Sequence, residues 1–565
     1  MTPPAIVILG TGALETATRI QARYPGAQVH GLRGRVDADL AYSELGAHLC
    51  DLYARGTPIV ALCAAGIVIR CIAPLLSNKG IEPPVLAVAE DGSAVVPLLG
   101  GLAGVNIMAR DIAATLDVAP AITTSGELRF GTCVLNPPDG YALASLAQGK
   151  RFVSDLLAGE STRIEGDAPW LDGTDVPRTP ASRLAIRVTP NVWNGDTNEL
   201  VIYPRSVVVA LHAGSNDEAT IEARILAALN EHNLAREALA ALVIASNVER
   251  IDEYVQAASA LGVPLRLTDT HAPTSSDALL MHAMRVPCEF VHRTHDLTLA
   301  VTRGPVDPTA IGRARGRLTV LGLGPGRADL MAPAARNALD EATDILGYDT
   351  YVRMAGPFRA DQRVHGTDNR EEMQRARHAF ELACEGRSVA MVSSGDPGVF
   401  AMAAAVLEAL DTSADPRWSS VDLVIVPGVS AALATAAQAG APLGHDFCML
   451  SLSDNLKPWD VIEDRLRHAA QADLVMAFYN PISRARPWQL DKALDIVRER
   501  RLPETVVVLG RDIGRPGATL TTTTLGALRS TDVDMRTMVI IGSSLTRRFG
   551  HEASREWVYT PRWYR

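Results

Sequence analysis

Four glycine- or proline-containing loops, each directly after an apolar run, are the segments of this chain best suited to chemistry. They lie within Gly322–Gly326, Ser393–Gly398, Val424–Ala431 and Ala477–Pro481. Glycine lets the backbone approach a ligand where a side chain would block it. In open α/β sheets, ligands collect where the carboxyl ends of strands converge. The four loops together therefore predict one binding site for a small molecule.

Two of the glycine-rich loops invite comparison with the dinucleotide-binding fingerprint, and neither fits it. The third glycine of that fingerprint is replaced by Glu15 after Gly10 and Gly12, and by Arg327 after the Gly322–Gly326 loop. Pro325 also fixes φ and removes a backbone donor inside the second turn. The first loop is interpreted as a tight strand–helix turn, and the second as part of a different ligand site.

The elements that must position these loops are short strands alternating with helices. Apolar runs such as Ile6–Leu9 and Ile59–Cys63 alternate with helix-length amphipathic stretches such as Asn106–Leu116 and Ile251–Leu261. This alternation is typical of α/β domains with largely parallel sheets. The stretch Glu160–Asn198 has little periodicity and is expected to be a linker with a few extended pieces.

Length and composition limit the classes of protein and partner. At roughly 150 residues per domain, 565 residues predict three or four domains. The formal net charge of −10 and an aromatic share of 5% argue against a nucleic-acid partner. A small anionic ligand remains possible, because 54 Lys and Arg side chains are present.

Cysteine usage and apolar runs indicate a cytoplasmic protein without a metal site. The seven cysteines include no C-x-x-C pair, so neither a zinc site nor a disulfide framework is expected. Met1–Gly10 lacks the basic region of a signal peptide and is interpreted as a first strand. No run approaches the ~18 apolar residues of a membrane span, so no membrane contact is expected.

The region from about Arg317 to Phe549 resembles the tetrapyrrole methyltransferase family, the class III S-adenosylmethionine-dependent methyltransferases. The four loops, in this order and context, carry that resemblance. Within the family, further motifs resemble the precorrin-3B C(17)-methyltransferases of cobalamin biosynthesis. These motifs are Ala441–Phe447, Leu450–Asp454, Pro458–Trp459, Phe478–Pro481, Thr521–Thr524, Asp532–Met535 and Val539–Ser544.

The resemblance implies a two-lobed α/β domain that divides near Gly428, with S-adenosylmethionine between the lobes and the tetrapyrrole in the facing trough. The residues that it implies as cofactor contacts are Gly322, Gly324, Pro325, Gly326, Gly395, Asp396, Pro397, Ser430, Ala431, Tyr479, Asn480, Pro481, Gly510 and Met538. No metal is implied. Methyl transfer from a sulfonium depends mainly on holding donor and acceptor in line.

Methylation at carbon 17 is coupled in this family to contraction of the ring, and a general base is then useful. By motif position the candidates are His445, Asp446 and Asp454, although Gly-His-Asp can also be a turn whose aspartate caps a helix. The substrate carries many carboxylates, which arginine binds in a bidentate manner. Arg353, Arg484 and Arg511 are the candidate substrate contacts.

Residues 1 to about 130 resemble the amino-terminal part of the cobalt-precorrin-5A hydrolase family. The resemblance rests on Ala64–Arg70, Ala73–Leu76, Pro97–Gly101 and Gly104–Asn106, and residues 200–300 resemble that family's small carboxyl-terminal domain more faintly. The family's loop has a histidine where this chain has Leu102 after Gly101. Two hypotheses therefore remain for this half of the chain: it hydrolyses a precorrin lactone, or it only binds or hands over the intermediate.

The expected organisation has two small α/β domains before a two-lobed methylase domain. The boundaries are 1–135 for the amino-terminal domain, 136–199 for a linker or middle region, 200–302 for the small domain, 303–316 for a second linker and 317–565 for the methyltransferase.

Three hypotheses for function follow from the resemblance. The first is a methyltransferase that converts precorrin-3B to precorrin-4 as a homodimer, with a hydrolase-like amino-terminal half. The second is a bifunctional cobalt-precorrin-3B methyltransferase and cobalt-precorrin-5A hydrolase, and the third makes the amino-terminal half a non-catalytic tetrapyrrole carrier. The sequence does not distinguish a metal-free substrate from a cobalt-bound one.

Overall fold

The chain forms two compact units, which are described separately. The computed structural model describes residues 3–76, 82–212, 220–248, 250–269, 275–368, 371–483, 486–550 and 556–563. The first unit comprises Met1–Val243, Glu253–Pro264 and Pro273–Ile311. The second comprises Ile244–Asp252, Leu265–Ala272 and Gly312–Arg565.

The first sheet of the first unit has six strands in the order β3-β2-β1-β4-β5-β6. All neighbours are parallel except β5 and β6. The strands are β1 Ala5–Ile8, β2 Gln28–Leu32, β3 Leu40–Tyr42, β4 Ile59–Leu62, β5 Val85–Val88 and β6 Val95–Leu99, and the helices are α1 Leu14–Arg23, α2 Leu45–Ala54, α3 Ala65–Ile72 and α4 Val105–Leu116. Hydrophobic clusters cover both faces of this sheet, so β1 and β4 are continuous apolar runs. The helix expected at Asn106–Leu116 is α4.

A second sheet occupies much of the region that the sequence indicated as a linker. Its order is β7-β10-β9-β8, and it packs with α5 and α6 around Phe130, Phe152 and Leu184. The elements are α5 Ser125–Phe130, β7 Tyr141–Leu143, α6 Leu146–Leu157, β8 Thr162–Glu165, β9 Leu184–Val188 and β10 Glu199–Pro204. The stretch 160–198 therefore contributes two strands to a packed core. Its strands are short and separated by long polar loops, which is why periodicity in the sequence does not reveal them.

The remaining strands of the first unit lie in the order β14-β15-β11-β12. β11 pairs parallel with β12 and antiparallel with β15, and β14 is the edge strand. The bounds are β11 Val207–Leu211, α7 Ile221–Glu231, β12 Leu239–Ala245, α8 Ile251–Leu261, α9 Ser276–Ala283, β14 Cys288–Arg293 and β15 Leu297–Thr302. The helix expected at Ile251–Leu261 is α8.

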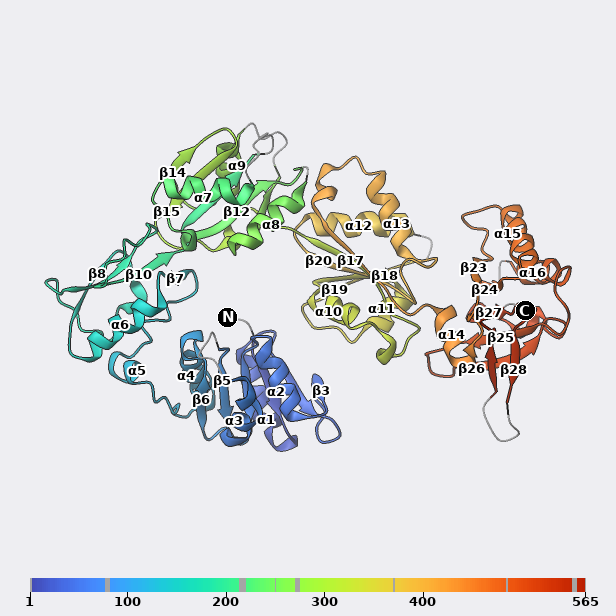
Figure 1. The fold of residues 1–565 in the computed structure, drawn as a ribbon, viewed down its shortest axis with the longest axis horizontal. Helices are drawn as coiled ribbons and strands as arrows, with labels where there is room; N and C mark the ends of the chain where they lie inside the picture. The colour runs from blue at the N-terminus through green and yellow to red at the C-terminus, as the bar shows by residue number, and fades with distance from the viewer. Residues whose placement is uncertain are drawn as a thin grey trace. The chain divides into compact units, whose positions relative to one another are not determined.

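In the second unit, a short antiparallel pair precedes a five-stranded parallel sheet. β13 Leu265–Thr268 pairs with β16 Arg313–Ala314. The parallel sheet has the order β19-β18-β20-β17-β21, and Figure 1 shows α10 and α11 on one face and α12 and α13 on the other. The elements are β17 Arg317–Gly322, α10 Pro333–Glu341, β18 Asp344–Tyr348, α11 Asp349–Ala355, β19 Arg363–Thr367, α12 Glu372–Cys384, β20 Ser388–Ser393, α13 Met402–Asp411 and β21 Asp422–Val426.

The last part of the second unit is a mixed sheet in the order β23-β24-β27-β25-β26, with a small sheet β22-β29-β28. The chain passes from the parallel sheet to this part at residues 427–430, so Gly428 lies at the division. The elements are α14 Ala431–Ala439, β22 Gly440–Ala441, β23 Phe447–Ser451, α15 Trp459–Gln471, β24 Val475–Tyr479, α16 Gln489–Arg498, β25 Val506–Arg511, β26 Thr519–Thr524, β27 Thr537–Ile541, β28 Arg547–Phe549 and β29 Trp557–Tyr559. The α/β class expected from the sequence is confirmed.

Within the described ranges, no helix combines the length and the apolar character needed to cross a bilayer.

Candidate active site

Three of the four predicted loops meet at the carboxyl edge of the parallel sheet. β17 lies between β20 and β21 and is parallel to both, so the three strands end at the same edge. The loops after β17 and β20 are joined by backbone hydrogen bonds: Gly395 N–H donates to Gly324 O at 2.8 Å, and Gly324 N–H donates to Gly395 O at 3.2 Å. The convergence expected from strand direction is therefore present in the fold.

Glycine is required at this edge because the loop backbones touch. A Cβ atom on Gly322 would lie 2.3 Å from Gly395 O, and one on Gly428 would lie 2.2 Å from the same oxygen. Gly395 itself has φ +72°, where other residues are strained. The glycines thus permit a packing of three backbones that no side chain could enter.

Asp396 ties the loops together through its carboxylate. Gly398 N–H donates to Oδ1 at 2.8 Å, and Gly428 N–H donates to Oδ2 at 3.0 Å. The next residue, Pro397, accepts from Ala403 N–H at 2.9 Å and so joins the loop to α13. Because both carboxylate oxygens accept backbone N–H groups, Asp396 positions the loops.

The mixed sheet brings a matching set of residues to one of its edges. β24 and β25 are both antiparallel to β27, so the carboxyl ends of β24 and β25 lie with the amino end of β27. That edge carries Tyr479, Gly510 and Met538, and Gly510 and Met538 are direct partners across the strands. A Cβ atom on Gly510 would lie 2.4 Å from Thr435 of α14, so this glycine allows the helix to approach the sheet.

Hydrogen bonds and a ring contact join this edge to the loops of the parallel sheet. Ala432 N–H, in the first turn of α14, donates to Tyr479 Oη at 3.2 Å, and the rings of Tyr479 and Phe400 lie 5.2 Å apart. Arg515, in the loop after β25, donates to Pro325 O at 3.2 Å and to Ser394 Oγ at 3.1 Å. Gly514 O lies 3.0 Å from the position of a Cβ on Gly326. The loops of both sheets therefore form one site.

The other expected cofactor residues belong to the same cluster. Ser430 caps α14 by accepting from Leu433 N–H, and Ala431 N lies 3.8 Å from the Cβ position of Gly395. Asn480 has φ +50° and donates through Nδ2 to Ser451 Oγ at 3.1 Å, and the buried Pro481 follows it. The structure thus gathers the predicted cofactor set from four loops and two strand ends.

The chemistry of this cluster suits a molecule held mainly by backbone groups. The backbones of the loops lie so close together that they leave no room for side chains between them. The hydroxyl Oγ of Ser393, at the end of β20, is buried and has no hydrogen-bond partner within the described residues. A buried hydroxyl without a partner normally costs free energy, so it marks a position where a polar ligand atom fits.

His445 and Asp446 do not join this cluster. They precede β23, whereas Ser451 and Tyr479 end the parallel strands β23 and β24. A strand of five residues spans about 17 Å at ~3.3 Å per residue, so the two candidates lie at the opposite edge of the sheet. Asp446 N–H donates to His445 Nδ1 at 2.8 Å, and the Asp446 side chain is 85% exposed. The geometry is that of a turn at the start of a strand.

Asp454 lies at the edge of the cluster, where it is engaged by two side chains. Arg486 pairs with its Oδ1, and Gln489 Nε2 donates to the same oxygen at 3.1 Å. Asp454 therefore orders the segment after β23 against α16.

The candidate substrate arginines differ in their surroundings. Arg511 pairs with Asp534 at 2.8 Å and with Asp512 at 3.1 Å, at the same edge as Gly510. The side chain of Arg353 is 79% exposed and lies 3.8 Å from Asp349 on α11. Arg484 lies outside the described residues.

Residues that the sequence did not single out complete the cluster. Phe400 has φ +53° and is 52% exposed, which is unusual for a large apolar side chain. Lys457 Nζ lies 6.0 Å from the centre of the Phe400 ring, and burial, followed by the charge of Arg465, lowers the pKa of this lysine. No sequence signal marks either residue, because both positions depend on contacts between distant segments.

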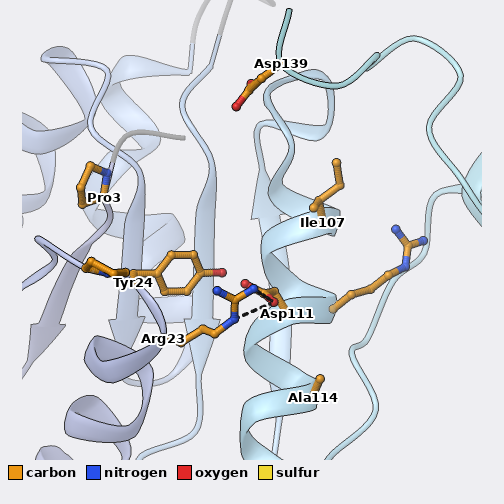
Figure 2. A pocket seen from close by; sticks show the side chains of 9 residues that line it. Pro3, Arg23, Tyr24, Ile107, Asp111, Ala114 and Asp139 are labelled. Atoms are coloured by element: carbon orange, nitrogen blue, oxygen red, sulfur yellow. Dashed lines mark hydrogen bonds and ion pairs between the residues drawn. The ribbon is translucent and has the colours of Figure 1, made fainter. Parts of the chain in front are cut away.

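A separate cavity of about 660 Å³ lies in the first unit. Figure 2 shows Arg23 reaching Asp111, with Tyr24 beside them and Ile107 and Asp139 on the rim. Arg23 pairs with Asp111 at 2.7 Å. Arg110, which also lines the cavity, pairs at 2.6 Å with the buried Glu127. Both arginines are therefore neutralised by carboxylates, which weakens this cavity as a site for a polycarboxylate.

Comparison with family models assigns two regions of the chain. Residues 317–529 match the family of tetrapyrrole (corrin/porphyrin) methylases, and residues 47–127 match the family described as cobalamin synthesis G N-terminal. The first match contains the four loops of the cluster up to Gly510, and the second contains β4 to α4 of the first sheet.

Individual relatives match the same carboxyl-terminal region. A precorrin-3B C(17)-methyltransferase of a Sinorhizobium species is 51% identical over 249 residues, which are 44% of this chain and 97% of that protein. The cobalamin biosynthesis protein CobIJ of Mycobacterium tuberculosis is 46% identical over 261 residues, and this chain spans 50% of its length. The crystal structure of the methyltransferase CobJ is 51% identical, covers 44% of this chain and all of that one, and gives a TM-score of 0.41.

Proposed function

This chain belongs to the tetrapyrrole methylases, and from that membership we propose that residues 317–565 methylate precorrin-3B at carbon 17 in cobalamin biosynthesis. The observation that carries the proposal is the meeting of loops from two sheets around Gly322, Gly395 and Gly428. The 51% identity to a precorrin-3B C(17)-methyltransferase names the substrate and the ring carbon.

The methylases of this family use S-adenosylmethionine, and the cluster suits that molecule. Its sulfonium supplies an electrophilic methyl group. The residues that would hold it lie in the Gly322–Gly326 loop, Gly395–Pro397, Ser430–Ala431 and Tyr479–Pro481, and Gly510 and Met538 would also contact it. Two features support a bound cofactor here: the Ser393 hydroxyl, which has no partner within the described residues, and the close approach of the loop backbones at their glycines.

The chain's own residues act by positioning. Transfer of a methyl group to carbon needs the donor and the acceptor in line. Orienting the two reactants in this way can lower the activation barrier by ~7–11 kcal/mol. Asp396 fixes the Gly398 and Gly428 amides, and Arg515 fixes the Pro325 loop against the loop after β25. These contacts lock the loops that define the direction of transfer.

Ring contraction to precorrin-4 also requires loss of a hydroxyl proton. Asp454 stands at the correct edge of the mixed sheet, but its pairing with Arg486 makes it a positioning residue. His445 and Asp446 lie at the other edge of the sheet, and the proposal gives them no part in the proton transfer. The carboxylates of the substrate would meet the half-buried Lys457, a cation beside Phe400 in the cluster. Arg511 would bind them only by exchanging its present partners, Asp534 and Asp512.

The amino-terminal region, which matches the cobalamin synthesis G model, is assigned a binding role. In the loop after β6, Gly100 has φ +83° and Gly104 has φ +91°, and Leu102 between them is 41% exposed. An apolar side chain at this tip suits contact with a macrocycle better than hydrolysis of a lactone. Release of a two-carbon fragment by the full chain from a lactone-bearing precorrin would instead make the enzyme bifunctional.

Two further features belong to the same proposal. A cavity of about 560 Å³ is lined by Gly440, Ala441, Phe549, Trp557, Val558 and Tyr559, and Phe549 is 54% exposed, which supports a homodimer through this surface.

The seven unpaired cysteines suit the reducing cytoplasm.

The test is conversion of substrate by the full chain. Precorrin-3B and S-adenosylmethionine are incubated with the wild-type chain, and the product mass is measured. A gain of one methyl group, located at carbon 17 by NMR, supports the proposal. Methylation at another carbon, or none with either the metal-free or the cobalt-bound substrate, overturns it.

A further inference from the structure

In the first unit, the adjacent residues Glu231 and His232 meet His292, which lies 60 residues beyond His232 in the chain. His232 Nε2 lies 3.0 Å from His292 Nδ1, and His292 Nδ1 lies 3.8 Å from a carboxylate oxygen of Glu231. The two imidazole rings are nearly perpendicular, at 72° with centres 5.1 Å apart. Within the described ranges, this is the one group of three His, Cys, Asp or Glu side chains whose donor atoms could surround a metal ion.

Glu231 and His232 lie at the carboxyl end of helix α7. Glu231 is the last residue of α7, and His232 is its C-cap. The chain then turns sharply at Asn233, which has φ +54°. The last carbonyl groups of a helix carry partial negative charge, so a cation is favoured beside them.

The partner histidine comes from the edge strand β14. A bulge between Phe290 and His292 interrupts the pairing of β14 with β15. Bulges re-aim side chains, and His292 is turned so that only 17% of its side chain is exposed. The Glu231 side chain is 66% exposed, so the cluster is open to solvent on one side.

The donor set has a defined preference among metal ions. Two imidazole nitrogens and one carboxylate oxygen suit zinc and similar divalent transition metals, whereas Mg²⁺ and Ca²⁺ prefer oxygen ligands. With Zn–N bonds of ~2.0–2.1 Å, two nitrogens of a tetrahedral site lie about 3.3 Å apart. The observed 3.0 Å is close to that value.

We propose that Glu231, His232 and His292 bind one divalent zinc-class cation, with water in the remaining coordination position. Without metal, the same nitrogen pair is joined by a hydrogen bond in which one ring carries the proton. For the ion to bind, that proton must move to the other nitrogen of its ring, so that both neutral imidazoles present a lone pair to the ion. The ion then joins the end of α7 to the edge strand β14. The sequence predicted no metal site, because 60 residues separate the two histidines and no spacing motif links them.

The proposal is tested with the full-length chain and the metal alone. The protein is treated with a chelator, dialysed against Zn²⁺ in the presence of a competing chromophoric chelator, and its metal content is measured. We expect one bound Zn²⁺ per chain, and a Co²⁺-loaded sample with the visible absorption of a tetrahedral site.

Variants identify the ligands. His232→Ala and His292→Ala should each weaken Zn²⁺ binding by more than the ~10–100-fold that loss of a hydrogen-bonded supporting residue costs. Glu231→Gln should weaken it by ~10-fold. His282→Ala, which removes an exposed histidine of α9, is the matched control and should bind like the wild type. If the alanine variants fail to fold, His292→Gln keeps a polar partner for His232 and replaces them.

Two results overturn the proposal. One is less than a stoichiometric amount of Zn²⁺ on the wild-type chain. The other is stoichiometric Zn²⁺ that the variants of Glu231, His232 and His292 leave unchanged. Neither result bears on the methyltransferase activity, because the cluster and the methyltransferase loops share no residue.

Discussion

Gly428→Ala tests the glycine cluster most severely, because the added methyl group has nowhere to go. Its Cβ would lie 2.2 Å from Gly395 O and 3.0 Å from Gly322 Cα. All of these neighbours are backbone atoms, so no side chain can rotate away. An ordinary contact begins at 3.4 Å, so the loops must separate by about 1.2 Å.

That displacement sets the expected magnitude. A misplacement of ~1 Å in a positioned reactant can cost ~10²-fold in rate, which is ~2.7 kcal/mol. Overpacking of this kind costs ~1–3 kcal/mol, so binding of S-adenosylhomocysteine should weaken ~10–100-fold. Isothermal titration calorimetry measures the affinity, and single-turnover methylation of precorrin-3B measures the rate.

Gly304→Ala is the control, because the same change meets no atom within 4 Å there. Gly322→Ala should resemble Gly428→Ala, since its Cβ would lie 2.3 Å from the same oxygen. Thermal unfolding of each variant separates a local effect from global loss of structure. If folded Gly428→Ala binds and turns over like Gly304→Ala, the loops do not form the cofactor site.

Three other perturbations give independent checks. Each carboxylate oxygen of Asp396 accepts one backbone N–H, and Asp396→Asn replaces one of these oxygens by an NH2 donor, which costs ~1–3 kcal/mol. Calorimetry should therefore show weaker binding of S-adenosylhomocysteine. The control Asp446→Asn changes a side chain that is 85% exposed and should bind like the wild type. His445→Gln should keep kcat within ~3-fold of the wild type and leave the pH–rate profile unchanged, because a residue at the far edge of the sheet moves no proton of the substrate. A 100-fold loss of kcat would contradict the inference that His445 takes no part in catalysis. Burial, followed by the neighbouring His48, lowers the pKa of His30 to about 4. The unfolded chain therefore binds a proton below pH ~6.5 that the folded sheet does not bind, which lowers stability at pH 5 by about 2 kcal/mol relative to pH 7. Urea titrations should show a smaller loss of stability for His30→Gln than for the wild type, and burial, which also lowers the pKa of His48, accounts for a remaining loss.

The convergence of the glycine loops could be predicted from the sequence because its signal is local. Each combines an apolar strand with a glycine or proline turn, and parallel strands place such turns at one edge. Gly322, Gly395 and Tyr479 lie where this reasoning puts them. The role of Gly428 was less visible, because it depends on a contact with a backbone oxygen 33 residues away in the chain.

The positions of the acid–base and substrate candidates could not be predicted in this way. His445 and Asp454 are close in sequence, but β23 runs between them and carries them to opposite edges. Nor does a sequence show which cations are already paired. Arg486 is taken by Asp454, and Arg511 by Asp534 and Asp512.

The region 160–198 shows a related limit. Its strands β8 and β9 are short, and their burial comes from packing against α6 and Phe130. Local periodicity does not report such long-range packing, so residues of a folded core resembled a linker.

The most direct test of the central claim is a crystal structure of the full chain with S-adenosylhomocysteine. The account predicts that the ligand lies between the Gly322–Gly326 loop, Gly395–Pro397 and Tyr479–Pro481, with a polar atom within hydrogen-bond distance of Ser393 Oγ. Ligand density beside His445, or at any place that leaves these three loops without contact, would contradict it.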